Sequence, residues 1–447
     1  MVKIHNLRSF IQVLEETNQL VRITRPVSLT HELADVAATL VRSGGGVPLF
    51  ENVEGSEWPI FASGVTNPKR AALALGCPES EVTDFMARVL EPNNGIAPTR
   101  VETAKWKANV QTGPEIDVRK LPIPTHSRGD GGAFITGGVV VSQDPRSGRG
   151  NLSYNRMQIH GPREFGFNAN EWRHVRDFME SRADPTAPFP VAIAIGLDPA
   201  IMIAAAVRTE QDELTIAGAI RGEGVPVTAG VTVDVNIPSE AEIVIEGLVH
   251  TGQRKGEGPL GEFHGYYGEE WQSPTFEVTA VCWRDNPIFQ TIIPGWYEHV
   301  YLGNVLPREP LLLKFVKHIN KEAVVHIPPY SNGFSAIVQL KKNNPGQPKN
   351  VALAALTAHI NIKQVIVVDP DVNIYDPADV LWALTNRVDW RLDMFTVPYA
   401  QGHEMDPTAD IRGVHTKIGI DATYKPERRE YGARVTYNMV DLTKYIG

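Results

Sequence analysis

The middle of the chain contains a series of short runs of β-branched residues, and this series limits the possible folds more than any other feature. Each run is bounded by glycine, proline or aspartate, and together they lie between residues 133 and 295. Short strands separated by turn residues are typical of antiparallel barrels and sandwiches. One helical pattern, at residues 170–181, interrupts them. The predicted strands are 139–141, 191–195, 231–235 and 242–245.

Helical and extended patterns alternate on both sides of this β-rich region. Apolar residues recur there at helical spacing, and shorter apolar runs lie between the helical stretches. This alternation predicts an α/β unit at each end of the chain. The predicted helices are 7–14, 33–40, 82–90, 310–320, 351–359 and 377–386, and the predicted strands outside the centre are 48–50 and 365–368.

The 447 residues exceed the length of one ordinary core, so we expect several domains. A connector rich in proline, with Pro114, Pro122 and Pro124, suggests a boundary near residue 115. The predicted fold class is α+β, with a central β domain between two α/β units. The predicted domains are an N-terminal α/β domain at 1–115, a central β-barrel domain at 116–305, a linker helix at 306–325 and a C-terminal α/β domain with an oligomerisation tail at 326–447.

Charge and cysteine content argue against several classes of protein. The net charge of −9 gives no basic footprint for nucleic acid. Cys77 and Cys282 are too few for a disulfide framework, which fits a reducing, cytoplasmic setting. The most apolar stretch, residues 191–207, is interrupted by Asp198 and Pro199. We therefore expect two buried strands joined by a turn there, and no membrane span or targeting signal in the chain.

Two acidic residues flank a turn sequence near residue 260. The stretch Gly256-Glu257-Gly258-Pro259-Leu260-Gly261 matches a dinucleotide-binding pattern literally. Pro259 lacks an amide donor, however, and the Glu257 carboxylate would repel a pyrophosphate, so we reject that interpretation. A turn can instead bring Glu257 and Glu262 to one pocket, where paired carboxylates perform acid–base chemistry. On spacing alone, two ordinary acids on a solvated loop are the simpler interpretation.

Polar residues also alternate along a predicted strand. Asn151, Ser153 and Asn155 share one face of an ideal strand, whereas Arg156 has the opposite parity. A bulge or turn is needed to bring all four to one ligand, and a strand with one wet face is the alternative. Elsewhere, His174 and Glu213 add an imidazole and a carboxylate. With an Asn they suit Mn²⁺ or Mg²⁺ better than Zn²⁺, but their spacing alone does not indicate a metal site.

Taken in order, these segments resemble the UbiD family of prenylated-FMN-dependent decarboxylases. Residues 151–156 (Asn-Leu-Ser-Tyr-Asn-Arg) are similar to the family's N-x-[SG]-x-x-R segment, and residues 212–218 contain a glutamate before an Ala-Gly pair. The stretch 257–267, with both glutamates, carries the most specific resemblance. Residues 365–371 resemble the family's strand with an acidic end, with Pro370 in place of the more usual Asp.

The resemblance implies a flavin-reductase-like split β-barrel that binds prenylated FMN, Mn²⁺ (or Mg²⁺) and K⁺. Loss of CO₂ from an sp² carbon leaves a carbanion that side chains cannot stabilise, and the modified flavin would supply the electron sink. Arg156, Glu257 and Glu262 would form the catalytic set, with Glu262 as the proton donor. Homodimers or larger assemblies, and a flavin prenyltransferase as cofactor supplier, are also implied. The implied metal ligands are Asn151, His174 and Glu213, and the implied cofactor contacts are Asn151, Ser153, Arg156, Arg173, His174, Glu213 and Lys363.

The implied substrate is an unsaturated, aromatic or heteroaromatic acid. Residues 296–308 are similar to a segment of furan-2,5-dicarboxylate decarboxylases, where His299 and Arg308 would recognise a second anionic group. Arg308 alternatively pairs with Glu309 or caps the linker helix. Hydroxybenzoate and pyrrole-2-carboxylate enzymes remain alternatives within the family. An FMN-binding oxidoreductase and a non-catalytic assembly protein are the alternatives outside it.

Overall fold

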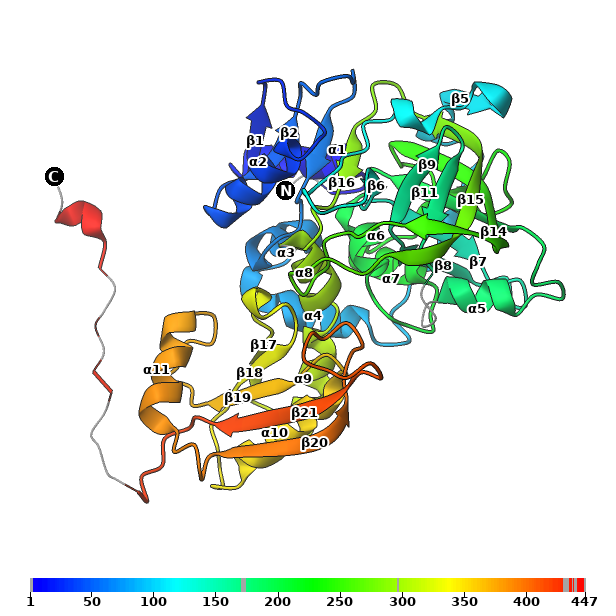
Figure 1. Cartoon of the computed structure of the whole chain (residues 1–447). Helices are drawn as coiled ribbons and strands as arrows, with labels where there is room; N and C mark the ends of the chain where they lie inside the picture. Colours follow the sequence, from blue (N-terminus) through cyan, green and yellow to red (C-terminus); the bar gives the residue numbers. More distant parts are fainter. Residues whose placement is uncertain are drawn as a thin grey trace.

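The computed structural model describes residues 3–169, 174–295, 297–428, 434–435, 437 and 440–445. It arranges them as an N-terminal α/β domain, a central β domain and a C-terminal α/β domain (Figure 1). The last described residues extend away from the C-terminal domain in this view. None of the helices in the described ranges is long and apolar enough to cross a membrane.

The N-terminal domain pairs helices with a four-stranded sheet of order β1-β2-β3-β16. Its predicted helices are confirmed, and α1 begins at a reciprocal cap in which Asn6 and Ser9 each accept from the other's backbone amide. Strand β16 comes from the end of the central region and pairs in parallel with β3. The elements are α1 (Leu7–Glu16), β1 (Leu20–Ile23), α2 (Glu32–Arg42), β2 (Val47–Phe50), β3 (Ile60–Ala62), α3 (Pro68–Leu75), α4 (Val82–Val89) and β16 (Phe289–Thr291).

The central domain is built on a nine-stranded sheet that curls into half a barrel (Figure 1). Its path runs β6-β9-β10-β15-β14-β11-β7-β8, and β5 pairs with β15. A separate small sheet has the order β13-β12-β4. The strands are β4 (Thr99–Arg100), β5 (Asn109–Thr112), β6 (Phe134–Ile135), β7 (Val139–Gln143), β8 (Gly150–Tyr154), β9 (Met157–Gly161), β10 (Glu164–Phe167), β11 (Phe189–Ile195), β12 (Pro226–Ala229), β13 (Asn236–Pro238), β14 (Ile243–Glu257) and β15 (Trp271–Trp283), and the helices are α5 (His174–Glu180), α6 (Pro199–Ala204) and α7 (Glu213–Arg221).

Two predicted strands of this domain are wrong. The second half of residues 191–207 forms the buried helix α6, because the Asp198 carboxylate caps it and Pro199 suits its first position. Residues 231–235 form a loop, because the backbone amides of Val231 and Thr232 donate to the buried Glu246 carboxylate. In both segments a carboxylate accepts from backbone amides. The apolar pattern from which the strands were predicted contains no information about these hydrogen bonds.

The C-terminal domain carries a five-stranded sheet of order β17-β18-β19-β21-β20, with α10 against it. The linker into it consists of α8, a π-helix (η5) and α9, and the predicted helices at 351–359 and 377–386 are confirmed as α10 and α11. The elements are α8 (Glu298–Val300), η5 (Tyr301–Val305), α9 (Glu309–Lys317), β17 (Val324–His326), β18 (Ser335–Gln339), α10 (Gln347–Ala358), β19 (Gln364–Val368), α11 (Pro377–Arg387), β20 (Met394–Gln401) and β21 (Val414–Asp421). Short 3₁₀ turns are η1 (Glu79–Glu81), η2 (Lys105–Lys107), η3 (Gly113–Glu115), η4 (Val118–Lys120), η6 (Pro329–Ser331) and η7 (Leu442–Lys444).

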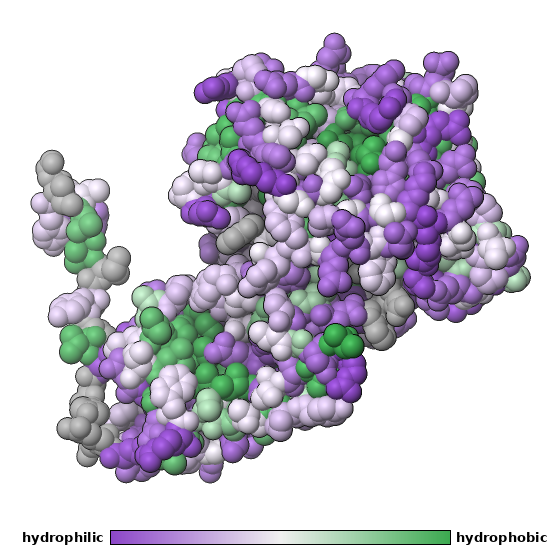
Figure 2. All heavy atoms as spheres, viewed as in Figure 1, coloured by the Kyte–Doolittle hydropathy of each residue, from purple (hydrophilic) through white to green (hydrophobic). Residues whose placement is uncertain are grey.

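One apolar core joins the three domains. It runs from Phe10 of α1 through Val141 of β7 to Leu312 of α9 and Val338 of β18, all buried. The linker therefore lies at the junction of the domains. Outside the core, exposed apolar side chains gather on the C-terminal domain and on the extended tail, where Tyr437 is 90% exposed (Figure 2).

Candidate active site

The Arg156 side chain lies between two glutamates. Its Nε donates to Oε1 of Glu257 and its Nη1 donates to Oε1 of Glu262. Glu257 is the last residue of β14, and Glu262 lies in the following turn. The side chains of Arg156, Glu257 and Glu262 are 17%, 0% and 12% exposed, respectively. One guanidinium thus holds two carboxylates, one buried and one at the edge of solvent.

The backbone path explains how Arg156 reaches these acids despite its strand parity. Strand β8 ends at Tyr154 and β9 begins at Met157, so Arg156 lies in the connection and not in an ideal strand. The glutamate turn is held close by. Gly258 approaches Gly131 so tightly that a Cβ at Gly258 would lie 2.6 Å from the Cα of Gly131. Glycine at these positions permits the approach.

Two residues that the sequence did not indicate complete the surroundings of Glu257. Ser273 of β15 donates its hydroxyl to Oε2, and the Asn168 amide lies 3.4 Å from Oε1. Lys255 lies two residues before Glu257 on β14, and Ser273 of β15 pairs with Lys255 across the ladder. Cross-strand pairing is the signal that identifies it, and this pairing is visible only in the fold.

The three predicted metal ligands lie together at the edge of the same sheet. Asn151 is on β8, His174 begins α5 and Glu213 begins α7. His174 Nδ1 lies 3.1 Å from Asn151 Oδ1, and the Leu152 amide donates to Glu213 Oε2 over 2.9 Å. The Asp212 carboxylate caps α7 by accepting from Leu214 N. Strand β8 thus brings the three side chains to one place.

This donor set fits a hard divalent cation. Burial raises the pKa of Glu213 to about 8, because the carboxylate is removed from water. Asn151 is 3% exposed, and its Oδ1, the amide atom that can bind a cation, lies 3.1 Å from His174 Nδ1. Oxygen and imidazole donors suit Mn²⁺ or Mg²⁺. This cluster contains only two residues of the kinds His, Cys, Asp and Glu, because its third donor is an asparagine. Among the described residues, no group of three or more His, Cys, Asp or Glu side chains could hold a metal ion.

The remaining predicted cofactor contacts lie in different parts of the chain. Ser153 is buried on β8, and its hydroxyl donates to Asn155 Oδ1 over 2.8 Å. Arg173 lies outside the described residues. Lys363 is in the C-terminal domain, where its Nζ lies 2.7 Å and 2.9 Å from the two carboxylate oxygens of Asp406.

Both predicted substrate residues lie on the linker, and His299 lies beside the glutamate turn. The ring of Phe263, the residue after Glu262, lies 6.3 Å from His299 and 5.7 Å from Phe334 of the C-terminal domain. The Nδ1 of His299 accepts from the Gly295 amide over 3.1 Å. Arg308 is the residue before α9, and the π-helix η5 separates it from His299. π-helical turns are frequent at functional sites.

The linker and C-terminal domain bring further basic side chains near this position. Burial, together with the positive charges of Arg308, His403 and Arg208, lowers the pKa of His359 to about 2. The ring of His403 lies 5.9 Å from that of Phe263. His359 and His403 carry no signal in the sequence, because they lie far along the chain from the recognised motifs.

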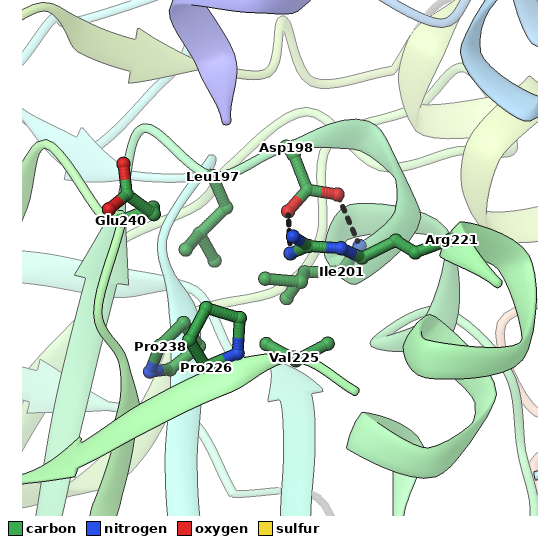
Figure 3. Close-up of a pocket in the computed structure, with 8 residues that line it drawn as sticks. All are labelled: Leu197, Asp198, Ile201, Arg221, Val225, Pro226, Pro238 and Glu240. Carbon is green, nitrogen blue, oxygen red and sulfur yellow. Dashed lines mark hydrogen bonds and ion pairs between the residues drawn. The ribbon is translucent and has the colours of Figure 1, made fainter. Parts of the chain in front are cut away.

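A separate small pocket lies between helices α6 and α7 and strands β12 and β13, and it contains none of the predicted site residues (Figure 3). Within it, Arg221 Nη1 lies 3.3 Å from Asp198 Oδ2, and both side chains are almost fully buried. Their mutual pairing indicates a structural role for this pocket. It is lined by Leu197, Asp198, Ile201, Arg221, Val225, Pro226, Pro238 and Glu240.

Comparison with known proteins identifies the class of enzyme. The chain matches the N-terminal, Rift-related and C-terminal domains of 3-octaprenyl-4-hydroxybenzoate carboxy-lyase over residues 11–90, 99–297 and 301–422. The protein is therefore a carboxy-lyase. It belongs to the UbiD family, as its sequence predicted, and the predicted fold class is confirmed.

Solved structures agree over the whole chain. The UbiD-class enzyme HmfF from Pelotomaculum thermopropionicum, in complex with FMN, is 34% identical with a TM-score of 0.92, and the match covers 99% of this chain and 100% of that one. An evolved dimeric form of HmfF in complex with prFMN is 32% identical with a TM-score of 0.88, over 99% and 100% of the two chains. Apo 3,4-dihydroxybenzoic acid decarboxylase (AroY) from Klebsiella pneumoniae is 29% identical with a TM-score of 0.92, again over 99% and 100%.

Proposed function

We propose that the protein catalyses the reversible, non-oxidative decarboxylation of an aromatic or heteroaromatic acid with prenylated FMN. The observation that carries this proposal is the Arg156 guanidinium held between Glu257 and Glu262. When bound, the prenylated flavin supplies the electron sink that a carbanion on an sp² carbon requires. The similarity to an HmfF structure in complex with prFMN supports this choice of cofactor.

The two glutamates are given different roles because their surroundings differ. Glu257 is fully buried and bonded to Arg156 and Ser273, so it holds the guanidinium in place. Glu262 is partly exposed and is bonded to one arm of the guanidinium. We assign to Glu262 the delivery of a proton to the carbon that CO₂ has left, and in the reverse direction its removal. Arg156 orients both acids.

Asn151, His174 and Glu213 would hold a Mn²⁺ (or Mg²⁺) ion, whose charge would offset that of the cofactor phosphate, and K⁺ would be a second cation of the site. Ser153 and Arg173 would add contacts to the cofactor, and Lys363 would reach the phosphate from the C-terminal domain. We also propose a cytoplasmic homodimer or larger homo-oligomer that receives its cofactor from a flavin prenyltransferase. The evolved form of HmfF is dimeric, which supports an assembly of this kind.

For the substrate we propose a heteroaromatic dicarboxylate such as furan-2,5-dicarboxylate. The aromatic Phe263 beside Glu262, with His299 and Arg308 on the linker, offers a flat apolar contact and a cation for a second carboxylate. A 3,4-dihydroxybenzoate-type acid is the second candidate, favoured by the similarity to AroY. A pyrrole-2-carboxylate is a further alternative, and an oxidoreductase using plain FMN would be recognised by NADH oxidation.

The proton-donor role is tested with Glu262→Gln in protein co-expressed with a flavin prenyltransferase. We expect turnover to be abolished while the absorption spectrum and mass analysis still show bound prenylated FMN. Full activity of this variant would refute the role.

Substrate recognition is tested with Arg308→Ala against matched mono- and dicarboxylates. Because a hydrogen bond to a charged group contributes about 1.5–3 kcal/mol, we expect a loss of about 10- to 150-fold in kcat/KM that is specific to dicarboxylates. Equal losses on both kinds of acid would count against recognition of a second carboxylate.

A further inference from the structure

Glu298, the residue before His299, is a buried carboxylate bound by another domain. It begins α8 on the linker and is 2% exposed. Its Oε1 accepts from the Val65 amide of the N-terminal domain over 2.7 Å, and the neighbouring amides of Gly64 and Ser63 also stabilise its anion. Successive backbone amides of this kind form an anion-binding nest. The start of α8 is thus attached to the N-terminal domain through one side chain.

The backbone on both sides of this contact is in an unusual conformation. Ser63 has φ of 60° and Tyr297 has φ of 45°, although neither is glycine. A non-glycine residue held in such a conformation is strained and persists only where its surroundings impose it. The two segments are therefore held in strained conformations where they meet, as is common near functional sites.

The electrostatics of Glu298 are unfavourable for a purely structural role. Burial raises its pKa to about 7, and its Oε2 has no hydrogen-bond partner within the described part of the chain. The charged and titratable groups that face it are Arg70 of α3 and the buried Tyr154 of β8. Arg70 directs its guanidinium to Thr66 and to the Gly45 carbonyl instead. A neutral side chain of the same size would avoid much of this penalty.

The position of His299 gives the contact a consequence at the active site. Helix α8 has three residues and continues directly into η5, so the anchored Glu298 side chain fixes the first turn of this helical stretch, the turn that carries His299. We propose that Glu298 is a positioning residue, which uses the 63–65 amides of the N-terminal domain to set the His299 ring against Phe263. This inference rests on the proposed function in one respect, that His299 contacts the substrate.

The experiment compares wild type with Glu298→Gln, each as prenylated-FMN holoenzyme with furan-2,5-dicarboxylate. Glutamine keeps the shape but loses the negative charge that the amides bind. Since His299 would bind the substrate equally in ground and transition states, we expect KM to rise about tenfold with kcat changed less than about twofold. In a double-mutant cycle, Glu298→Gln should add nothing to His299→Ala, and losses that multiply would overturn the proposal.

Glu246→Gln provides a matched control. Glu246 is also fully buried and accepts from three successive amides, those of residues 231–233, but it lies on β14 about 35 Å along the strand from Glu257. We expect this variant to keep the wild-type KM. A KM increase equal to that of Glu298→Gln would show a general effect of losing a buried carboxylate and would overturn the proposal.

A readout that needs no turnover separates this inference from the proposed function. The ring resonances of His299, assigned by their loss in His299→Ala, are compared by NMR in wild type and Glu298→Gln. We expect them to shift, and unchanged resonances would overturn the positioning role whatever the substrate. If they shift but His299→Ala leaves KM unchanged, the positioning role stands and the substrate role of His299 in the proposed function is wrong.

Discussion

The raised pKa of Glu298 predicts how the stability of Glu298→Gln changes with pH. Burial moves the pKa from about 4.5 to about 7, so the folded protein binds this proton more tightly than the unfolded chain. Unfolding then releases a proton between pH 4.5 and pH 7, and wild-type stability falls as pH rises through this window. The full effect is about 3 kcal/mol at pH 8. Glutamine does not titrate, so the stability of the variant lacks this decrease with rising pH.

The expected result is a difference in melting temperature, variant minus wild type, that grows with pH. For a chain of 447 residues the unfolding entropy is about 0.9 kcal/mol per degree, so 3 kcal/mol corresponds to about 3 °C. Differential scanning fluorimetry of both proteins at half-unit steps from about pH 5 to about pH 8.5 measures it. The difference should rise up to about pH 7 and then level off. A difference that is constant across the range would refute the reasoning.

Three further predictions concern the remaining site residues. Arg156→Lys should lower kcat by at least about 100-fold with flavin still bound, because a point charge cannot hold both Glu257 and Glu262; single-turnover kinetics measure it. Ser273→Ala removes the hydroxyl bonded to the buried Glu257 and should reduce stability by about 1–3 kcal/mol in urea unfolding, whereas an unchanged midpoint would contradict that bond. His174→Ala should lose bound manganese, and the melting temperature that rises with added Mn²⁺ in wild type should not rise in the variant. Retained manganese in elemental analysis would show that His174 is not a ligand.

The sequence predicted the elements that depend on local patterns. Helices α1, α2, α10 and α11 follow from apolar spacing, and their predicted ranges overlap those of the structure, although α10 begins at Gln347 and not at residue 351. The strand predictions were wrong where a single polar side chain determines the local fold. The apolar run at 191–207 continues as a helix because Asp198 caps it, and residues 231–235 form a loop because Glu246 binds their amides.

The geometry of the candidate site was only partly predictable. The residues of the Arg156 cluster were recognised by resemblance, but strand parity placed Arg156 on the wrong face. The connection between β8 and β9 reverses that placement. Ser273 and His403 carry no local signal at all, because their contacts with Glu257 and Phe263 arise from strand pairing and domain packing. Long-range contacts of this kind appear only in the folded chain.

The division of the site among domains suggests how chemistry and specificity are separated in this protein. The acids and the guanidinium belong to the central half-barrel alone, so their mutual geometry does not depend on the other domains. His299 lies on the linker, which Glu298 anchors to the N-terminal domain, and Phe334 reaches Phe263 from the C-terminal domain. If His299 contacts the substrate as proposed, a substitution at these junctions changes which acid is bound and leaves Arg156, Glu257 and Glu262 in place for the decarboxylation step. On the same proposal, we expect differences in substrate preference to arise at the linker, where the three domains meet.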